Sequence, residues 1–352
     1  MSVTDSDGLT TTRRPAETRA AAAPDPLLAL QHEFPRYRIC QETICGRARY
    51  VARSLEHGLR PHTVVTSDLA ELQAALEPSQ YGALIPFSAD VPNVARMYDY
   101  YLGGKDHLAA DRAAAQAILR EFPEVGQIAR ANRAFQARAV AFAAAQGITQ
   151  FIDLGAGLPT APATHDTAWA ACPDARVAYV DHDELVIAHA RALLAVDDKI
   201  AVVPADLRDA GAVLTSDALA SVIDLEQPVC VLLVSVLHFL RPRPADLVVA
   251  AYRQAMAPGS ILVISAGTST GTDPELIRSL QAAYHHTAPV TGRSQVDIAA
   301  WFGGLTMVPP GLADVRDWQP GPPGPPDRLP DSRGRFLAGV AVKPAAGQET
   351  QR

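Results

Sequence analysis

Apolar runs and helically spaced segments alternate along most of the chain. Between residues 148 and 286, five apolar runs are each followed by a segment in which apolar residues recur every three or four positions. The five runs are ITQFIDLG, RVAYVDHD, IAVVPADL, PVCVLLVSVL and SILVISAGT. Short apolar runs separated by amphipathic helices are typical of parallel strands with helices on both faces. The pattern therefore predicts an α/β fold with a doubly wound, mostly parallel sheet.

The end of the chain departs from this alternation. The runs LADVRDW and RFLAGVAVKP are joined by QPGPPGPPDRLPDSRG, in which proline and glycine exclude a helix. Strands that are joined without a crossover helix are expected to be antiparallel. The sheet is therefore expected to end in a C-terminal antiparallel hairpin. Before the first strand, the spacing predicts two helical segments, at about 92–120 and 126–147.

Composition divides the chain into five parts. They are a disordered tail (1–26), a small N-terminal α+β module (27–77), a linker (78–90), a large domain (91–344) and a second disordered tail (345–352). In the small module, two strand-like runs precede a predicted helix that is capped by Ser67 or Asp68. Leu69, Leu72 and Leu76 lie on one face of this helix.

Composition and charge also limit the classes of function. The 352 residues are 48% hydrophobic and 20% charged, a balance typical of soluble globular proteins. The net charge of −7 argues against nucleic acid or anionic membranes as the main partner. The longest apolar run has 13 residues, too few to cross a bilayer, and the N-terminus lacks a secretory signal. A cytoplasmic protein is expected. The four cysteines lack the spacing of a zinc site, so no metal is expected.

One basic cluster stands out against this acidic background. Between Arg36 and Arg60 there are six arginines and two glutamates. The cluster fits an unknown acidic partner of the small module, nucleic acid included, or simply a solvated sheet face.

The segment FIDLGAGLPT carries the first candidate site. Gly155 and Gly157 flank Ala156 directly after the first predicted strand, and glycine lets the backbone bend sharply and approach a ligand closely. A dinucleotide fingerprint would need a third glycine where this chain has Thr160. Asp153 is a poor neighbour for a phosphate but a good one for an ammonium group. A plain turn at the strand end is the simpler alternative.

Acidic residues also end the next two predicted strands. In YVDHD, Asp181 can accept hydrogen bonds from both hydroxyls of a ribose, with His182 and Asp183 beside it. In ADLRD, Asp206 can accept an adenine amino group while Leu207 lies against the ring. Ligands of such sheets bind at the carboxyl ends of the strands. Amino acid, ribose and base on successive strands describe S-adenosyl-L-methionine. Singly, Asp183 or Asp206 could equally be a helix cap.

Four more residues are candidates for binding or catalysis. His238, at the end of the fourth predicted strand, is the candidate general base, or else it packs beneath the adenine or satisfies a loop carbonyl. Ser235 is expected to line the methionine end of the site or to be an ordinary strand residue. Asn132 and Arg133 could bind the cofactor carboxylate, or lie on a solvated helix face.

A pair of glycines interrupts the first helical segment. Gly103 and Gly104 in RMYDYYLGGKDH cost helix stability and therefore need a structural reason. One is a lid that closes over the cofactor and brings Tyr98 to it. The other is a tight turn between two packed helices.

The sequence resembles the actinobacterial S-adenosylmethionine-dependent methyltransferases of the DUF574, or SAM-methyltransferase 19, family. The likeness extends from about Pro92 to Pro344. It rests on PNVARMYDYYLGGKDHLAADR, the most specific stretch, and on ARANRAF, FIDLGAGLPT, YVDHD, ADLRD, LLVSVLHFL and LAGVAVKP. The resemblance implies a Rossmann-like class I methyltransferase fold of seven strands.

The resemblance also implies S-adenosyl-L-methionine as cofactor and direct methyl transfer to an acceptor, expected here to be a small molecule. Such transfer depends mainly on the alignment of the reactants, and a general base is needed only for a protonated acceptor. Two alternatives are open. One is a non-catalytic S-adenosylmethionine-binding sensor or regulatory protein. The other is a nicotinamide-dependent oxidoreductase, against which Asp153 and Thr160 count.

Overall fold

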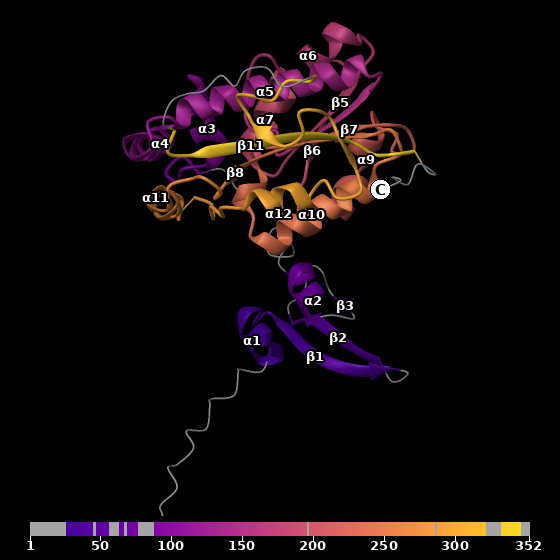
Figure 1. Cartoon of the computed structure of the whole chain (residues 1–352). Helices are drawn as coiled ribbons and strands as arrows, with labels where there is room; N and C mark the ends of the chain where they lie inside the picture. The colour runs from indigo at the N-terminus through magenta and orange to yellow at the C-terminus, as the bar shows by residue number, and fades with distance from the viewer. Residues whose placement is uncertain are drawn as a thin grey trace, which may run out of the picture. The chain divides into compact units, whose positions relative to one another are not determined.

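The computed structural model describes residues 26–44, 47–55, 63–66, 69–76, 88–195, 197–285, 287–321 and 332–345. The chain forms two compact units that divide after Leu76 (Figure 1). Most of the predicted tails and linker, and the predicted cap at Ser67 or Asp68, lie outside the described residues.

The N-terminal unit combines a small sheet with two helices. Its described elements are α1 (Pro26–Glu33), β1 (Tyr37–Ile44), β2 (Arg47–Ser54), β3 (Thr63–Thr66) and α2 (Leu69–Leu76). The strands are antiparallel in the order β1-β2-β3. Leu72 and Leu76 are fully buried in its core and Leu69 packs against them, as the helical spacing predicts. Helix α1 was not predicted, because only Leu30 of its eight residues is buried and the apolar pattern is weak.

The basic cluster lies partly on an exposed face of this small sheet. Arg38 of β1 stands directly opposite Arg53 of β2, and both are exposed. Arg53 pairs with Glu42 at 3.7 Å, a surface contact that contributes little to stability. Arg38 and Arg53 are thus solvated.

The larger unit is built on a mixed sheet of eight strands among the described residues. The parallel strands are β4 (Gln150–Leu154), β5 (Arg176–Asp181), β6 (Ile200–Pro204), β7 (Cys230–Val234) and β8 (Ile261–Thr268). Strand β11 (Arg335–Val342) runs antiparallel to β8, and it pairs with the short strands β9 (Thr306–Met307) and β10 (Ala313–Asp314). The predicted doubly wound sheet with a terminal antiparallel hairpin is confirmed. The two-residue strand β9 was not predicted.

The strand order places a cleft at the carboxyl edge. The order is β10-β11-β8-β7-β4-β5-β6, so the chain winds outward from β4 first toward β6 and then, from β7 on, in the opposite direction. The loops after β4 and β7 therefore lead away from each other. Such a switch point is where ligands bind in open α/β sheets.

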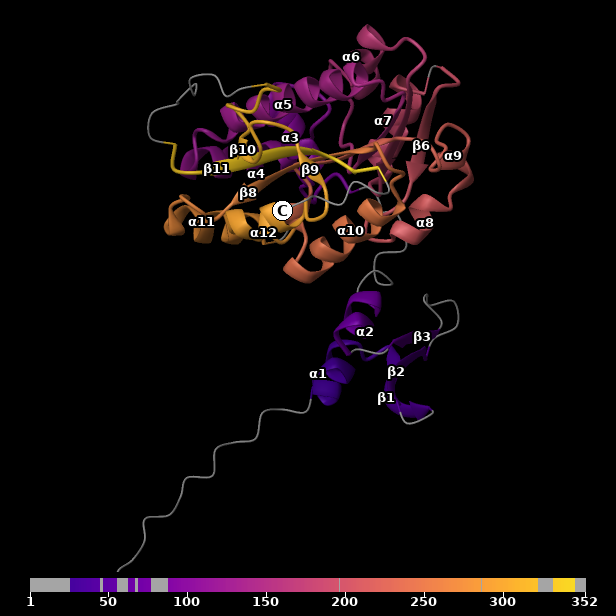
Figure 2. The same cartoon turned by 45° about the vertical axis from the view of Figure 1, so that its right-hand side comes forward.

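Helices cover both faces of this sheet. They are α3 (Val94–Leu102), α4 (Ala109–Glu121), α5 (Val125–Ala145), α6 (Thr164–Ala171), α7 (Glu184–Leu193), α8 (Ala210–Leu214), α9 (Asp217–Ala220), the 3₁₀ turn η2 (Leu237–Phe239), α10 (Pro242–Ala255), α11 (Pro274–Tyr284) and α12 (Gln295–Ala300). In two views, α5, α6 and α7 lie over one face and α10 and α12 over the other (Figures 1 and 2). No helix in the described ranges is both long and apolar enough to cross a membrane.

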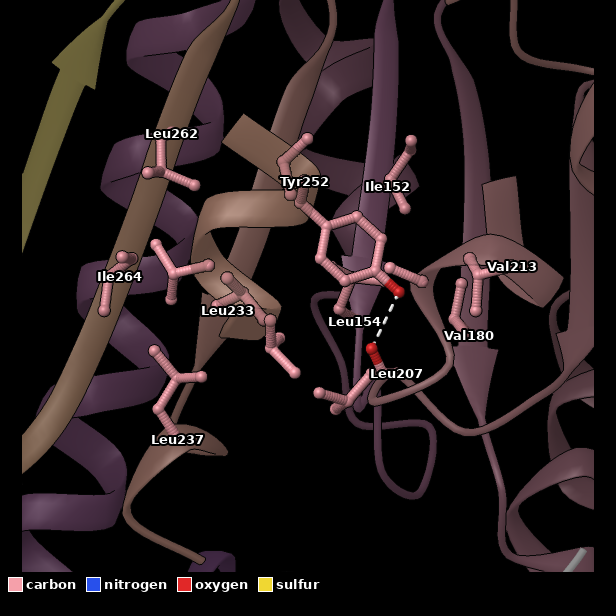
Figure 3. Packing of buried hydrophobic residues seen from close by; sticks show 14 of the residues in the cluster. Ile152, Leu154, Val180, Leu207, Val213, Leu233, Leu237, Tyr252, Leu262 and Ile264 are labelled. Atoms are coloured by element: carbon pink, nitrogen blue, oxygen red, sulfur yellow. Dashed lines mark hydrogen bonds between the residues drawn. The ribbon is translucent and has the colours of Figure 1, made fainter. Parts of the chain in front are cut away.

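Each face of the sheet has its own hydrophobic core. Ile152 and Leu154 of β4 point into one core and Phe151 into the other, as expected for a strand buried on both sides. Figure 3 shows the first core, in which Tyr252 of α10 donates a hydrogen bond at 3.0 Å to the carbonyl of Leu207. This bond anchors the loop after β6, and the core therefore positions one wall of the cleft.

Candidate functional site

A cavity of about 280 Å³ opens at the carboxyl ends of β4, β5, β6 and β7. Its walls come from the loops after these strands, from α3 and α5, and from the end of α11 with the residues that follow. The thirteen residues predicted to bind the cofactor all line it: Tyr98, Asn132, Arg133, Asp153, Gly155, Ala156, Gly157, Asp181, His182, Asp183, Asp206, Leu207 and Ser235. The structure thus brings together residues from six separate segments of the chain.

The glycine turn after β4 has the geometry that glycine makes possible. Gly155 has φ +71° and Gly157 has φ +66°, both in the left-handed region. The N–H groups of Gly155 and Ala156 donate to the carbonyl of Val180 at 2.8 and 3.1 Å. A Cβ on Gly155 would lie 2.8 Å from Cγ2 of Val236, so this position has no room for a side chain. The backbone is therefore held close to the cavity.

Asp181 anchors this turn to the end of β5. One carboxylate oxygen accepts the N–H of Gly157 at 2.9 Å, and the other accepts those of His182 and Asp183 at 2.8 and 3.0 Å. Burial raises the pKa of Asp181, while the positive potential of His182 and the backbone donors oppose that rise. A carboxylate has about four acceptor sites, so capacity for a ribose hydroxyl is left.

Asp183 has the geometry of a helix cap. One oxygen accepts the N–H groups of Leu185 and Val186 at 2.8 and 3.1 Å, which caps α7. The other accepts Nδ2 of Asn93 at 2.6 Å. Asn93 itself caps α3 by accepting from the N–H of Ala95. Asp183 therefore lines the cavity while joining α3 to the edge of β5, and Asn93 is a wall residue that sequence reasoning missed.

Asp206 has a partner that the sequence analysis did not foresee. Its carboxylate accepts from the backbone N–H of Arg208 at 2.8 Å and from Nε of the same residue at 2.9 Å. Both residues line the cavity. An adenine amino group would therefore have to donate to a carboxylate that already forms an ion pair with Arg208. The signal was visible in ADLRD, where the arginine follows two residues after the aspartate.

A buried polar network surrounds Asp153. One of its oxygens accepts from Nε2 of Gln136 at 3.0 Å and from the hydroxyl of Thr164 at 2.7 Å. Arg133 donates to Oε1 of Gln136 at 2.6 Å and to the carbonyl of Thr160 at 2.7 Å. Burial raises the pKa of Asp153, and its hydrogen bonds and Arg133 counteract that effect. Gln136 was missed, although it lies three residues after Arg133 on the same helix face.

A second polar chain crosses from β7 to α3. Ser235 has φ +59°, the one non-glycine residue of the described chain in the left-handed region, and its N–H donates to Oγ of Ser265 at 3.1 Å. That hydroxyl donates to Oδ1 of Asn132 at 2.6 Å, and Nδ2 of Asn132 donates to the hydroxyl of Tyr98 at 2.9 Å. This series of hydrogen bonds ends where the hydroxyl of Tyr98 donates to the carbonyl of Ala129. A strained backbone held this firmly is typical of functional sites.

Comparison with known families gives this cleft its context. The model of the S-adenosyl methyltransferases matches residues 83–344, well over half of the chain.

The chain belongs to the S-adenosyl methyltransferase family.

Two solved structures resemble this methyltransferase over most of their length. One is a Thermobifida fusca protein described as a candidate methyltransferase, 40% identical, with 73% of this chain and 96% of the other covered and a TM-score of 0.69. The other is a DUF574 family protein of Streptomyces avermitilis, 33% identical, with 73% and 99% covered and a TM-score of 0.68. No curated protein matches the chain.

The predicted resemblance is therefore confirmed. The chain is an S-adenosylmethionine-dependent methyltransferase, and its cofactor is S-adenosyl-L-methionine. The buried carboxylates and the tight glycine turn fit such a cofactor, because they offer acceptors for ammonium and hydroxyl groups beside a backbone without side chains. The alternatives of a non-catalytic sensor and of a nicotinamide-dependent oxidoreductase are not favoured.

His238 does not line the cavity of the methyltransferase. Its ring is buried against Phe239 and Phe336, with centroids 4.2 and 5.1 Å away, and its Nδ1 has no partner among the described atoms. Burial, aided by the charge of Arg293, lowers the pKa of His238 to about 3. A general base must reach the proton it removes. The predicted catalytic role of His238 therefore does not fit the structure, which instead shows a packing residue.

The paired glycines form a tight turn between α3 and α4. Gly103 has φ +82° and ends α3. A Cβ on Gly104 would lie 1.8 Å from Oδ1 of Asp99. The Asp99 carboxylate accepts from the N–H of Asp106 at 3.0 Å and lies 2.9 Å from Nδ1 of His107. The positive φ of Gly103 and the close packing of Gly104 against Asp99 explain the two glycines as a tight turn, without any need for a moving lid.

The remaining wall of the cavity was not predicted from the sequence. It is mainly apolar and comes from α3, the loop and turn after β7, and the segment that follows α11. Its members include Tyr101, Leu102, Val234, Val236, Phe239, Leu240, Tyr284, Thr287, Ala288 and Pro289. Nothing in the local sequence links these segments, which pack together only in the folded chain.

No metal centre is present among the described residues, since no group of three or more His, Cys, Asp or Glu could hold an ion. His285 is exposed directly after α11, and His286 lies outside the described residues.

Proposed function

We propose that this methyltransferase transfers the methyl group to a small-molecule acceptor by direct displacement. The observation that carries the proposal is that one cavity combines the polar carboxylate side with the apolar wall of α3, η2 and the segment after α11. Pockets of this kind, mostly apolar with a few convergent polar groups, are typical of sites for small molecules.

We assign the polar side of the cavity to the cofactor. Asp153, fixed by Gln136 and Thr164, offers its second oxygen to the ammonium group. Asp181 offers its remaining acceptor capacity to the ribose. Leu207 and the Asp206–Arg208 pair border the adenine. Each acceptor is buried, and buried hydrogen bonds to charged groups contribute more than exposed ones.

The role of the chain's own residues is then mainly alignment. The bound cofactor supplies a methyl group that the positive sulfur already makes electrophilic. The fixed glycine turn and the rigid Ser235–Ser265–Asn132 chain hold the reacting ends in one orientation. Well-oriented reactants gain about 7–11 kcal/mol in this way, so a catalytic base is not essential.

Calorimetric titration with S-adenosylmethionine, S-adenosylhomocysteine and NADH tests the cofactor side. We expect micromolar binding of the two adenosyl ligands and none of NADH. Incubation with S-adenosylmethionine and a panel of small molecules, followed by assay of S-adenosylhomocysteine, tests catalysis. A protein that binds the cofactor but releases no S-adenosylhomocysteine with any of them would favour a sensor.

We also propose a cytoplasmic location. Within the described residues, Cys40, Cys172 and Cys230 are free thiols, a state that reducing compartments maintain. Fractionation of cells that express the tagged protein would test this location.

A further inference from the structure

Two tyrosine hydroxyls meet at the apolar wall of the cavity. Tyr101 near the end of α3 and Tyr284 at the end of α11 are 183 positions apart in the chain, yet their hydroxyl oxygens lie 3.2 Å from each other. Both residues are buried, and both line the cavity. The pair therefore belongs to the surface that a ligand would touch.

This pair has one hydroxyl proton more than it uses. Two hydroxyls carry two protons, and the hydrogen bond between them takes one. Among the described residues, neither hydroxyl has another partner. Burial raises the pKa of Tyr101, and burial raises the pKa of Tyr284 to about 12, so both keep their protons. A buried donor without an acceptor is costly, and this donor is therefore available to an atom of the ligand.

The wall around the pair is apolar. Leu102 follows Tyr101 on α3, Phe239 lies with its ring centroid 5.8 Å from that of Tyr284, and Ala288 and Pro289 complete the surface. This environment favours a flat, apolar molecule over a sugar or another densely polar acceptor.

The described walls offer this acceptor no free base. Among the carboxylates, Asp99 is engaged with His107 and Asp106, and Asp183 caps α7 and accepts from Asn93. Asp153, Asp181 and Asp206 lie on the side of the cavity assigned to the cofactor. His182 follows β5, on the side assigned to the ribose. Arg133 and Arg208 are cationic. An acceptor that arrives without its proton needs no base.

We propose that the methyl acceptor is an apolar, ring-sized molecule with an ionised oxygen, a phenolate or a carboxylate, which accepts a hydrogen bond from the Tyr101–Tyr284 pair. This inference rests on the proposed function. A lone pair of that oxygen forms the new bond to the methyl carbon while the carbon–sulfur bond breaks, and its electrons remain on sulfur. The anionic acceptor becomes a neutral ether or ester, and no proton is released.

The probe for this site is 4-nitrophenol, whose ionised form alone is yellow. The protein is first saturated with S-adenosylhomocysteine and then titrated with 4-nitrophenol, with benzoate and with the neutral analogue nitrobenzene. We expect saturable binding of 4-nitrophenol in its yellow form, and binding of nitrobenzene at least tenfold weaker. Binding of benzoate as well would support both members of the proposed class, whereas absence of benzoate binding would restrict the acceptor to phenolates.

The double variant Tyr101→Phe/Tyr284→Phe removes both hydroxyls. Replacing both partners of a buried hydrogen bond by apolar groups of the same shape is nearly neutral for folding, so this variant should keep its fold and its affinity for S-adenosylhomocysteine. Its affinity for 4-nitrophenolate should fall at least tenfold, since a hydrogen bond to a charged group is lost. The two single variants identify the hydroxyl that donates to the ligand.

Tyr100→Phe is the matched control, because the hydroxyl of Tyr100 accepts from Gln116 at 3.2 Å and lies outside the cavity wall. It should bind 4-nitrophenolate like the unmodified protein. The inference would be overturned if the double variant bound 4-nitrophenolate as tightly as the unmodified protein does, or if nitrobenzene bound as tightly as 4-nitrophenolate. In either case, binding of S-adenosylhomocysteine would still uphold the proposed function. Absence of S-adenosylhomocysteine binding would instead overturn both.

Discussion

The backbone N–H of Gly157 donates to a carboxylate oxygen of Asp181 at 2.9 Å. This bond joins the turn after β4 to the end of β5, the two segments assigned to the amino-acid and ribose parts of the cofactor. The second oxygen of Asp181 accepts the next two N–H groups of its own loop. One buried carboxylate thus shapes two walls of the cleft, and it holds them in place before any ligand binds.

Replacement of Asp181 should therefore weaken cofactor binding. In Asp181→Ala we expect the affinity for S-adenosylhomocysteine to fall about tenfold to a hundredfold, because a hydrogen bond to a charged group contributes about 1.5–3 kcal/mol. Calorimetric titration measures the change. Asp174→Ala is the control, since the Asp174 side chain is 92% exposed and, within the described part of the chain, pairs with Lys199 on the surface. Unchanged affinity would mean that Asp181 anchors the turn without contacting the ribose.

The two glycines of the turn should differ in their tolerance of alanine. A methyl group on Gly155 meets Val236 at 2.8 Å, whereas the nearest atom to a methyl group on Gly157 is 4.0 Å away. Both positions carry a positive φ, which costs alanine about 1–2 kcal/mol, and overpacking adds about 1–3 kcal/mol at Gly155 only.

We therefore expect Gly155→Ala to lose more stability in urea unfolding, and more cofactor affinity, than Gly157→Ala. The double variant Gly155→Ala/Val236→Ala should recover part of the loss, because it removes the clashing methyl groups. A larger effect of Gly157→Ala would show that contact with the ligand, and not packing, dominates at this turn.

The turn between α3 and α4 makes a similar comparison possible. Gly104→Ala would force a Cβ to 1.8 Å from the Asp99 carboxylate and displace it from His107, so we expect the free energy of unfolding to fall by more than about 2 kcal/mol. Gly103→Ala meets no atom within 4 Å and should cost only about 1–2 kcal/mol for its positive φ. Urea unfolding measures both. If instead both variants fold normally and lose turnover equally, the glycines act as the hinge of a lid.

The sequence predicts the sheet well because burial on both faces makes the central strands continuous apolar runs. It also predicts which residues gather at the cleft, because the last residue of a parallel strand lies at the carboxyl edge of the sheet, independent of the conformation of the loops. The pairing of Asp206 with Arg208 and the cap at Asp183 are local, and they could be inferred from two- or three-residue spacings.

The rest of the site depends on contacts between distant segments. Asn93 meets Asp183 across 90 positions, and Ser265 meets Asn132 across 133. The periodicity of a segment does not indicate which distant residue its polar side chains contact, because the packing of whole helices and strands brings these residues together. His238 shows the opposite error. Its place after a strand suggested a site residue, but the turn η2 directs the ring into the core instead.

The buried ring of His238 should make stability depend on pH. Burial holds its pKa near 3 in the folded chain, below the ordinary value of 6.5, so the unfolded chain binds the proton more readily. The contribution of His238 is therefore complete above about pH 6.5 and is lost as the pH falls toward 3, by up to about 1.4 kcal/mol per pH unit.

In His238→Leu we expect the loss of stability due to His238 to vanish between pH 7 and pH 5. Urea unfolding at several pH values measures the free energy of unfolding against pH. The loss at neutral pH should be small, because leucine suits the apolar contacts with Phe239 and Phe336. His32→Leu serves as the control, since it also removes a histidine, but one whose side chain is exposed, and it should leave this dependence of stability on pH in place. If His238→Leu keeps this dependence on pH but abolishes methyl transfer, then His238 acts on the reaction and not through packing.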